Sequence, residues 1–158
     1  MNKAIFFDRD GVLVEPVNGH APWRVEELKL NPDIDYLKLL NEYYLFLISN
    51  QPDAANGKTI YAELHKIHDK FNRELKLKDI YFKIYYYCYH RKEDNCNCRK
   101  PSPYFILKAK DDFNLDLSKS WIVGDRDTDI ECGRNVGTKT IKINNMNLKN
   151  VVEEILSD

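Results

Sequence analysis

Short apolar runs and segments with a helical pattern of apolar residues alternate along the whole chain. Five runs have the length of a strand, at residues 4–8, 44–48, 80–87, 121–124 and 139–143. Helices are predicted between and after them, over about 32–42, 59–75, 103–113 and 128–135 and from 148 to about 155. In the clearest one, 59–75, apolar residues recur in steps of three and four. Strands that alternate with helices predict a parallel sheet with helices on both faces.

Turn signals agree with this alternation. Asn31-Pro32 and Ser102-Pro103 each offer a capping residue followed by a proline, which suits the first helical position. Residues 14–27 lack clear periodicity and contain two prolines, a glycine and Trp23, so we expect an ordered loop there. Because the chain has no internal repeat, no low-complexity tract and no linker, it predicts one Rossmann-like α/β domain over residues 1–158.

Composition narrows the class of protein. Of the 158 residues, 43% are hydrophobic and 31% are charged, which suits one globular domain with a sizeable core. The net charge of −1 gives no general attraction to nucleic acids or acidic membranes, so neither is expected as a partner. No apolar run approaches the roughly 20 residues of a membrane span. The first strand begins almost at the N-terminus, so we expect no signal peptide and a cytoplasmic protein.

Two acids stand at the end of the first predicted strand, in Ile5-Phe6-Phe7-Asp8-Arg9-Asp10-Gly11. Side chains two positions apart on a strand point to the same side, so Asp8 and Asp10 should lie together. Crowded carboxylates repel each other, and a bound cation or a shared proton relieves that repulsion. Asp-x-Asp-Gly is also a common turn signature, so the partners of these acids elsewhere in the chain must decide between a metal site and a simple turn.

Other strand ends are polar too, and in an open α/β sheet a ligand lies outside the carboxyl ends of the strands. The chain offers four such groups: Asp8 with Asp10, Ser49 with Asn50, Arg99 with Lys100, and Gly124-Asp125 with Asp129. Asp8, Asp10 and Asp125 are oxygen ligands of the kind that Mg²⁺ prefers. Lys100 can neutralise a phosphoryl group, to whose oxygens Ser49 and Asn50 can donate hydrogen bonds. The inventory therefore suits a hard cation together with a phosphate.

No serine or cysteine with a nearby base pattern offers itself as a nucleophile. A carboxylate can serve instead by forming an aspartyl-phosphate, provided that Mg²⁺ and Lys100 screen the two anions from each other. The second acid, Asp10, would protonate the departing alkoxide and later deprotonate the attacking water.

In their order along the chain, these groups resemble the four motifs of the haloacid dehalogenase superfamily of phosphohydrolases: Asp8-x-Asp10-Gly11-Val12, Ser49-Asn50, Lys100 and Gly124-Asp125-x-x-x-Asp129. The resemblance spans nearly the whole chain. It implies that Asp8 is the nucleophile and Asp10 the acid and base. It also implies a catalytic Mg²⁺ held by Asp8, the Asp10 carbonyl and Asp125. Asp129 would either support the metal site or act only as the acid of a helix first turn.

A second group of residues indicates zinc. Cys88, His90, Cys96 and Cys98 lie within eleven positions, and three thiolates with one imidazole match tetrahedral zinc chemistry. Four protein ligands leave no open position, so this zinc would be structural. It would stiffen the polar loop 91–95 and hold the residues that follow it. The alternative is three free thiols in a loop beside a solvated histidine.

The zinc loop, 88–99, narrows the resemblance. Residues 84–90 and 96–101 resemble the branch that contains the D-glycero-D-manno-heptose-1,7-bisphosphate 7-phosphatases and the histidinol-phosphate phosphatases. That branch has no large cap domain, and short loops shape its substrate pocket. Arg99 resembles its substrate-recognition arginine, and Arg126 stands where the branch often has a lysine. The chain departs from the heptose enzymes after Asn50-Gln51, where it continues with Pro52-Asp53.

Three features have alternative explanations. His65 and His68 lie three apart on a predicted helix and could share a metal, but no third ligand follows at helical spacing, so they are expected to be ordinary residues of the helix flank. Cys132 falls in a predicted helix away from the zinc loop and is expected in the core. His20 and Trp23 would cover the substrate, or Trp23 would only anchor its loop.

We therefore expect a monomeric Mg²⁺-dependent phosphatase with a small phosphorylated sugar as its partner, acting at the C7 phosphate of a heptose bisphosphate. Histidinol-phosphate phosphatase is the alternative among enzymes. Its cationic substrate would need an acidic pocket, whereas Arg91, Lys92, Arg99 and Arg126 favour a second anion. From another class, an inactive binding module built on the zinc loop is the alternative. The presence of both acids, the lysine and the distal aspartate argues against it.

Overall fold

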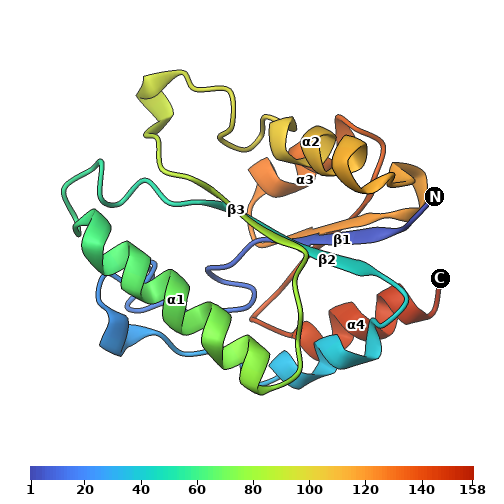
Figure 1. Ribbon diagram of the computed structural model, residues 1–158, viewed down its shortest axis with the longest axis horizontal. Helices are drawn as coiled ribbons and strands as arrows, with labels where there is room; N and C mark the ends of the chain where they lie inside the picture. The colour runs from blue at the N-terminus through green and yellow to red at the C-terminus, as the bar shows by residue number, and fades with distance from the viewer.

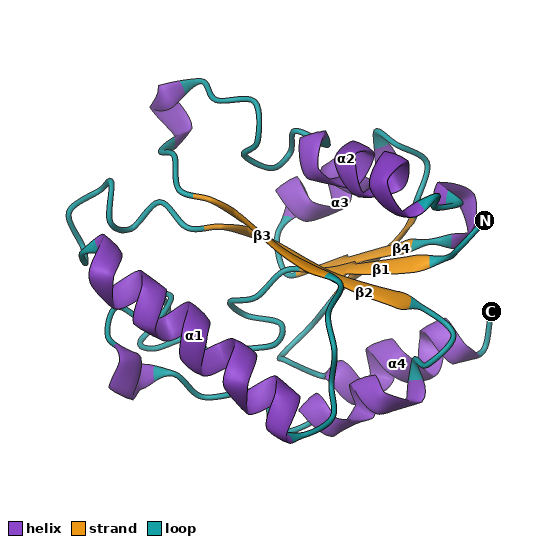
Figure 2. Ribbon diagram, viewed as in Figure 1, coloured by secondary structure: helices purple, strands orange, loops and turns teal.

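The computed structural model describes residues 1–158 as a five-stranded sheet between two layers of helices (Figures 1 and 2). Neighbouring strands are all parallel, in the order β3-β2-β1-β4-β5. The strands are β1 (Ala4–Phe7), β2 (Tyr44–Asn50), β3 (Ile84–Cys88), β4 (Trp121–Gly124) and β5 (Lys139–Lys142). The predicted α/β class with a parallel sheet is confirmed.

Four α-helices cover the two faces of this sheet. Figure 1 shows α2 (Tyr104–Phe113) and α3 (Asp127–Arg134) on one face, and α1 (Tyr61–Leu77) and α4 (Leu148–Leu156) on the other. No helix is both long and apolar enough to cross a membrane. The connections contain only short 3₁₀ helices and no inserted cap domain: η1 (Val25–Glu27), η2 (Ile34–Leu39), η3 (Lys92–Asp94) and η4 (Leu117–Lys119).

Successive side chains of β1 point alternately into two hydrophobic cores, one on each face of the sheet. Ile5 and Phe7 belong to a core of 24 buried residues that also takes in α1 and α4. Ala4 and Phe6 belong to a core of 11 buried residues beneath α2 and α3. All four side chains are fully buried. Burial on both faces explains why this strand reads as a continuous apolar run in the sequence.

The segment 32–42 differs from its prediction. The sequence predicts an α-helix there, whereas the chain forms the 3₁₀ helix η2 and no α-helix. The apolar residues Ile34, Leu37 and Leu40 are spaced by three, which matches the three residues per turn of a 3₁₀ helix as well as it matches one α-helical face. Asn31 does not cap a longer helix. Its Nδ2 donates to the carbonyls of Val12 (2.8 Å) and Met146 (2.9 Å), which ties two loops together.

The carboxyl ends of all the strands point to the same edge of the sheet, because every neighbouring pair is parallel. Residues that follow β1, β2 and β4 are therefore brought together there. The connection from β3 to α2, which contains η3, projects from the body of the protein beyond this edge (Figure 1).

Candidate active site

A pocket of about 220 Å³ opens at the carboxyl edge of the sheet. Every residue predicted for catalysis, Mg²⁺ or substrate lines it except Ser49: Asp8, Asp10, Asn50, Arg99, Lys100, Asp125 and Arg126. Ser49 is 1% exposed and does not line the pocket. Its hydroxyl accepts a hydrogen bond from Gln51 Nε2 (2.8 Å), and Gln51 takes the place at the pocket wall that was expected for Ser49.

Lys100 lies between two acids in the floor of the pocket. Its Nζ is 3.1 Å from Asp8 Oδ1 and 2.7 Å from Asp129 Oδ1, and it donates to the carbonyl of Ile48 at 2.6 Å. Burial lowers the pKa of Lys100, but the charges of Asp8 and Asp129 outweigh burial and leave this pKa above its usual range. Asp129 is therefore part of the charged centre, and it also lies in the first turn of α3, where it accepts the Arg126 N–H.

Two glycines allow the acids to approach this closely. Gly11 has a φ of +83°, and a Cβ at this position would lie 2.2 Å from Asp125 Oδ2. A Cβ on Gly124 would lie 2.2 Å from the Cβ of Asp129. Any larger residue at either position would displace an acid, which explains the glycine in both motifs.

Asp8, Asp125 and Asp129 form a group that can hold a metal ion, since their carboxylate oxygens lie within 4.8 Å of one another. Oδ1 of Asp125 is buried and has no hydrogen-bond partner. Burial raises the pKa of Asp8 to about 7, with help from the neighbouring acids and against the opposing effect of Lys100. Lys100 is the cation paired with this group of acids, and a divalent cation bound there would supply further positive charge. A site in which every donor is an oxygen suits Mg²⁺.

The side chain of Asp10 lies outside this metal-binding group and is held by hydrogen bonds. Gln51 Nε2 donates to its Oδ2 at 2.7 Å, and Arg9 Nε donates to its Oδ1 at 3.1 Å. The side chain is 19% exposed, so it can reach a bound ligand. We did not predict a role for Gln51 or Arg9, although both flank predicted motif residues.

Asn50 fixes the segment that carries Lys100. Its Oδ1 accepts from the Lys100 N–H (3.0 Å), and its Nδ2 donates to the Lys100 carbonyl (3.3 Å). This pair of bonds joins the end of β2 to the loop after β3. The amide expected to bind phosphate is thus engaged with the backbone, and its contribution is to place the lysine.

A second cavity, of about 410 Å³, adjoins the pocket and shares Asn50, Arg99, Lys100, Arg126 and Thr128 with it. Lys92 contributes a further cation to its lining. This cavity extends the basic side of the site toward the zinc loop.

Arg99 has no acidic partner. It donates one hydrogen bond, to the carbonyl of His90 at 3.3 Å. The loop acids Glu93 and Asp94 pair with Arg91 instead. No acid neutralises the guanidinium charge of Arg99, so this charge is available to a ligand.

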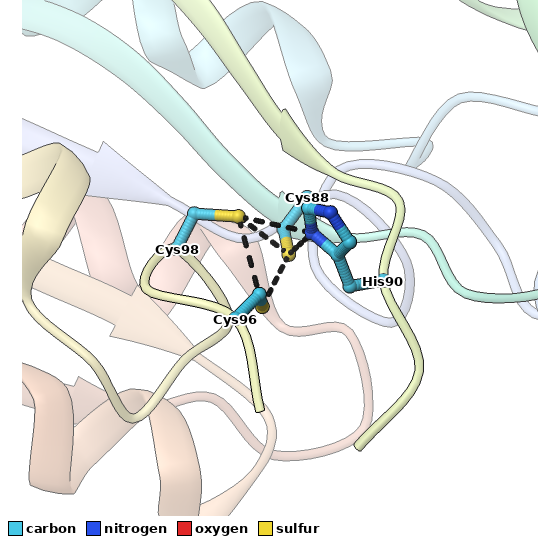
Figure 3. A group of neighbouring side chains, drawn as sticks. All are labelled: Cys88, His90, Cys96 and Cys98. Atoms are coloured by element: carbon cyan, nitrogen blue, oxygen red, sulfur yellow. Dashed lines mark hydrogen bonds between the residues drawn. The ribbon is translucent and has the colours of Figure 1, made fainter. Parts of the chain in front are cut away.

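Figure 3 shows Cys88, His90, Cys96 and Cys98 with their ligand atoms facing one another. The sulfur of Cys96 is 3.6 Å from that of Cys88 and 3.8 Å from that of Cys98. Ligands held about 2.3 Å from a central zinc lie roughly 3.7 Å apart in a tetrahedron. Cys88 and Cys98 are closer, at 2.9 Å, but all the cysteines are free thiols. The geometry fits the predicted zinc site, and Cys132 lies apart in the core as expected.

His20 and Trp23 stack on each other, with ring centroids 3.7 Å apart, in the ordered loop after β1. Trp23 Nε1 donates to Asp53 Oδ2 at 3.0 Å, which anchors this loop to the one after β2. His20 and Asp53 line the pocket, whereas Trp23 does not. Trp23 is therefore the anchor, and His20 is the residue presented to a ligand.

Known proteins share these features. A family model described as HAD-hydrolase-like matches residues 97–145. A D-glycero-alpha-D-manno-heptose-1,7-bisphosphate 7-phosphatase from Campylobacter jejuni is 33% identical over 142 residues, which cover 88% of this chain and 80% of the relative. The chain belongs to the haloacid dehalogenase-like phosphatases. The family resemblance drawn from the four motifs is confirmed.

Two further comparisons concern a second group of relatives and the fold. The histidine biosynthesis bifunctional protein HisB of Baumannia cicadellinicola is 31% identical over 146 residues, which cover 90% of this chain but 41% of that relative. The crystal structure of a D,D-heptose 1,7-bisphosphate phosphatase from B. bronchiseptica, complexed with magnesium and phosphate, has a TM-score of 0.80 and 25% identity. That comparison covers 98% of each chain, so the two phosphatases share one fold from end to end.

Proposed function

We propose that this protein removes the C7 phosphate of a D-glycero-D-manno-heptose 1,7-bisphosphate, with Mg²⁺ as its catalytic cofactor. The observation that carries the proposal is the pairing of two kinds of site. A pocket with acids and a buried lysine adjoins a cavity lined by Lys92, Arg99 and Arg126. The first suits a phosphoryl group that is transferred, and the second suits a phosphate that is only held. The heptose bisphosphate phosphatase from Campylobacter jejuni supports the same substrate.

In the proposed reaction, the Asp8 carboxylate attacks phosphorus and becomes an aspartyl-phosphate. Lys100 stabilises the negative charge of the phosphoryl oxygens, which it can do because Asn50 fixes its position. Asp10 gives its proton to the oxygen that leaves with the sugar. It then takes a proton from the water that hydrolyses the aspartyl-phosphate. A bound Mg²⁺, held by Asp8, Asp125 and the Asp10 carbonyl, would supply positive charge to nucleophile and phosphate.

The second candidate is histidinol phosphate, because the pocket also contains Asp53, at the position where the chain departs from the heptose enzymes. Asp53 lines the pocket, and it could bind a cationic amine. Its Oδ2 is already engaged by Trp23. Lys92, Arg99 and Arg126 line the adjoining cavity and form no ion pair, and these three cations favour the bisphosphate.

A panel of phosphate esters tests the proposal. Phosphate release should be highest with the heptose 1,7-bisphosphate and lower with the heptose 7-phosphate and with histidinol phosphate. Removal of divalent metal with EDTA should abolish turnover, and added Mg²⁺ should restore it. Faster release from histidinol phosphate would identify the second candidate as the substrate. Full activity in metal-free protein would contradict the role of Mg²⁺.

Arg99→Ala should reduce kcat/KM on the bisphosphate by roughly ten- to a hundredfold. This is the effect of losing hydrogen bonds to a charged group, worth about 1.5–3 kcal/mol. Hydrolysis of the 7-phosphate should change little, because it never uses that contact. Arg91→Ala is the matched control, since Arg91 lies in the same loop but pairs with Asp94 and lines neither cavity. Equal losses on both substrates would mean that Arg99 only braces the loop.

The purified protein should contain one zinc per chain, held by Cys88, His90, Cys96 and Cys98. Elemental analysis measures the zinc directly. Cys98→Ser should lose it, whereas Cys132→Ala should keep it, because Cys132 lies in the core and not in the cluster. Loss of zinc should raise KM, because the loop borders the substrate cavity. It should change the melting temperature little, because the two hydrophobic cores lie elsewhere. Wild-type protein without zinc would contradict the assignment.

A further inference from the structure

Arg9 stands between Asp8 and Asp10 in the sequence, yet its side chain points away from solvent into the interior of the protein. This side chain is 0% exposed and is the largest by volume of the fully buried side chains. A buried guanidinium must place its donors on acceptors, because an unpaired buried charge is strongly destabilising. The acceptors of these hydrogen bonds therefore indicate the role of Arg9.

One side of the guanidinium faces the acid that is proposed to move protons. Nε donates to Asp10 Oδ1 at 3.1 Å, and a second nitrogen lies 3.4 Å from Oδ2. Gln51 Nε2 donates to the same Oδ2 at 2.7 Å and also to Ser49. Arg9 and Gln51 thus hold both carboxylate oxygens and fix the rotation of the Asp10 side chain.

The other side of the guanidinium faces helix α1. Its third nitrogen lies 2.9 Å from His68 Nδ1, in a buried contact between residues 59 positions apart in the sequence. An arginine can only donate hydrogen bonds, so Nδ1 must be the acceptor and the proton of the neutral imidazole is on Nε2. Burial, with the charge of Arg9, lowers the pKa of His68 to about 3, which agrees with a permanently neutral ring.

His68 is itself held in place by β3. Its ring stacks on that of Tyr87, with centroids 3.7 Å apart and planes 14° from parallel. The guanidinium of Arg9 lies 5.8 Å from the centre of the same tyrosine ring, within reach of a cation–π attraction. The prediction that His68 is an ordinary residue of the helix flank is therefore wrong: it is 6% exposed and hydrogen-bonded, whereas His65 is exposed.

We propose that Arg9 and His68 are positioning residues that orient Asp10 for proton transfer to the leaving group. The inference rests on the proposed role of Asp10 in the phosphatase reaction. In that step the P–O bond to the leaving group breaks, and the Asp10 proton passes to the departing oxygen. His68 acts at one remove, by accepting the hydrogen bond that keeps Arg9 turned toward Asp10.

The test compares two monophosphates that differ in leaving group. Benzyl phosphate releases an alkoxide that needs a proton, whereas p-nitrophenyl phosphate releases a stable phenolate that does not. The value of kcat/KM covers the steps up to departure of the leaving group. His68→Leu should lower it by about tenfold or more on benzyl phosphate, a share of what general acid catalysis contributes, and by less than about twofold on p-nitrophenyl phosphate.

Matched variants separate positioning from packing. His68→Asn keeps an acceptor near the position of Nδ1 and should restore most of the loss, whereas His65→Leu makes the same change on the exposed side of α1 and should have no effect. Arg9→Met should show the same dependence on leaving group. The double variant Arg9→Met/His68→Leu should be no worse than Arg9→Met alone, because the two residues act in series.

Equal losses on the two substrates, or a His68→Asn variant as impaired as His68→Leu, would overturn this inference while leaving the phosphatase reaction intact. If the wild-type protein releases no phosphate from either of these two esters and none from any sugar phosphate, the proposed function is overturned, and this inference with it.

Discussion

Asp8→Asn should abolish turnover while the protein remains folded. We expect kcat to fall by about a thousandfold or more, because an amide can neither attack phosphorus nor form the aspartyl-phosphate. The fold should persist, since Lys100 keeps its ion pair with Asp129 at 2.7 Å. Removing one of several crowded acids should leave the melting temperature of the metal-free protein unchanged or higher, because burial already raises the pKa of Asp8.

Two measurements check this expectation. Phosphate release from the best substrate of the panel gives the loss in kcat, and thermal unfolding with and without Mg²⁺ reports on the fold and on metal binding. In wild type, Mg²⁺ should raise the melting temperature, as any ligand of the native state does. In Asp8→Asn that rise should shrink. Activity within tenfold of wild type would rule out Asp8 as the nucleophile.

Lys100→Met should be the most damaging change to stability and activity together. It leaves the carboxylates of Asp8 and Asp129 buried without their counter-charge, and losing one partner of a buried ion pair costs about 3–5 kcal/mol. Turnover should fall by at least a hundredfold, because no cation replaces Lys100 beside the phosphoryl group. Urea unfolding and steady-state kinetics in saturating Mg²⁺ measure the two effects.

A surface lysine and a compensating variant control for trivial causes. Lys3 pairs with Glu42 in solvent, and Lys3→Met should cost less than about 1 kcal/mol, as exposed ion pairs do. Lys100→Met/Asp129→Asn should recover part of the lost stability, because it removes one uncompensated charge, but none of the lost activity. A Lys100→Met protein as stable and as active as wild type would show that the ion-pair geometry has no functional importance.

The local pattern of residues determined the five strands, the four α-helices and most of the residues that line the charged pocket. Burial on both faces makes β1 and β4 continuous apolar runs, and this signal needs no knowledge of distant residues. Parallel strands place all their carboxyl ends at one edge. Polar residues that follow different strands, such as Asp8 and Asp125, can therefore be assigned to one site from the sequence. The four predicted zinc ligands lie within eleven positions, so a single loop can bring them together.

Only the tertiary structure decided what each polar side chain meets. Ser49 and Gln51 are two positions apart, yet only Gln51 lines the pocket. A spacing of three suits both kinds of helix, so packing settled the 3₁₀ form of η2. The link from Arg9 to His68 joins the segment that follows β1 to helix α1, and the two residues are 59 positions apart in the sequence. Periodicity reports which face of an element is buried, whereas the partner of a buried polar atom depends on which elements lie side by side.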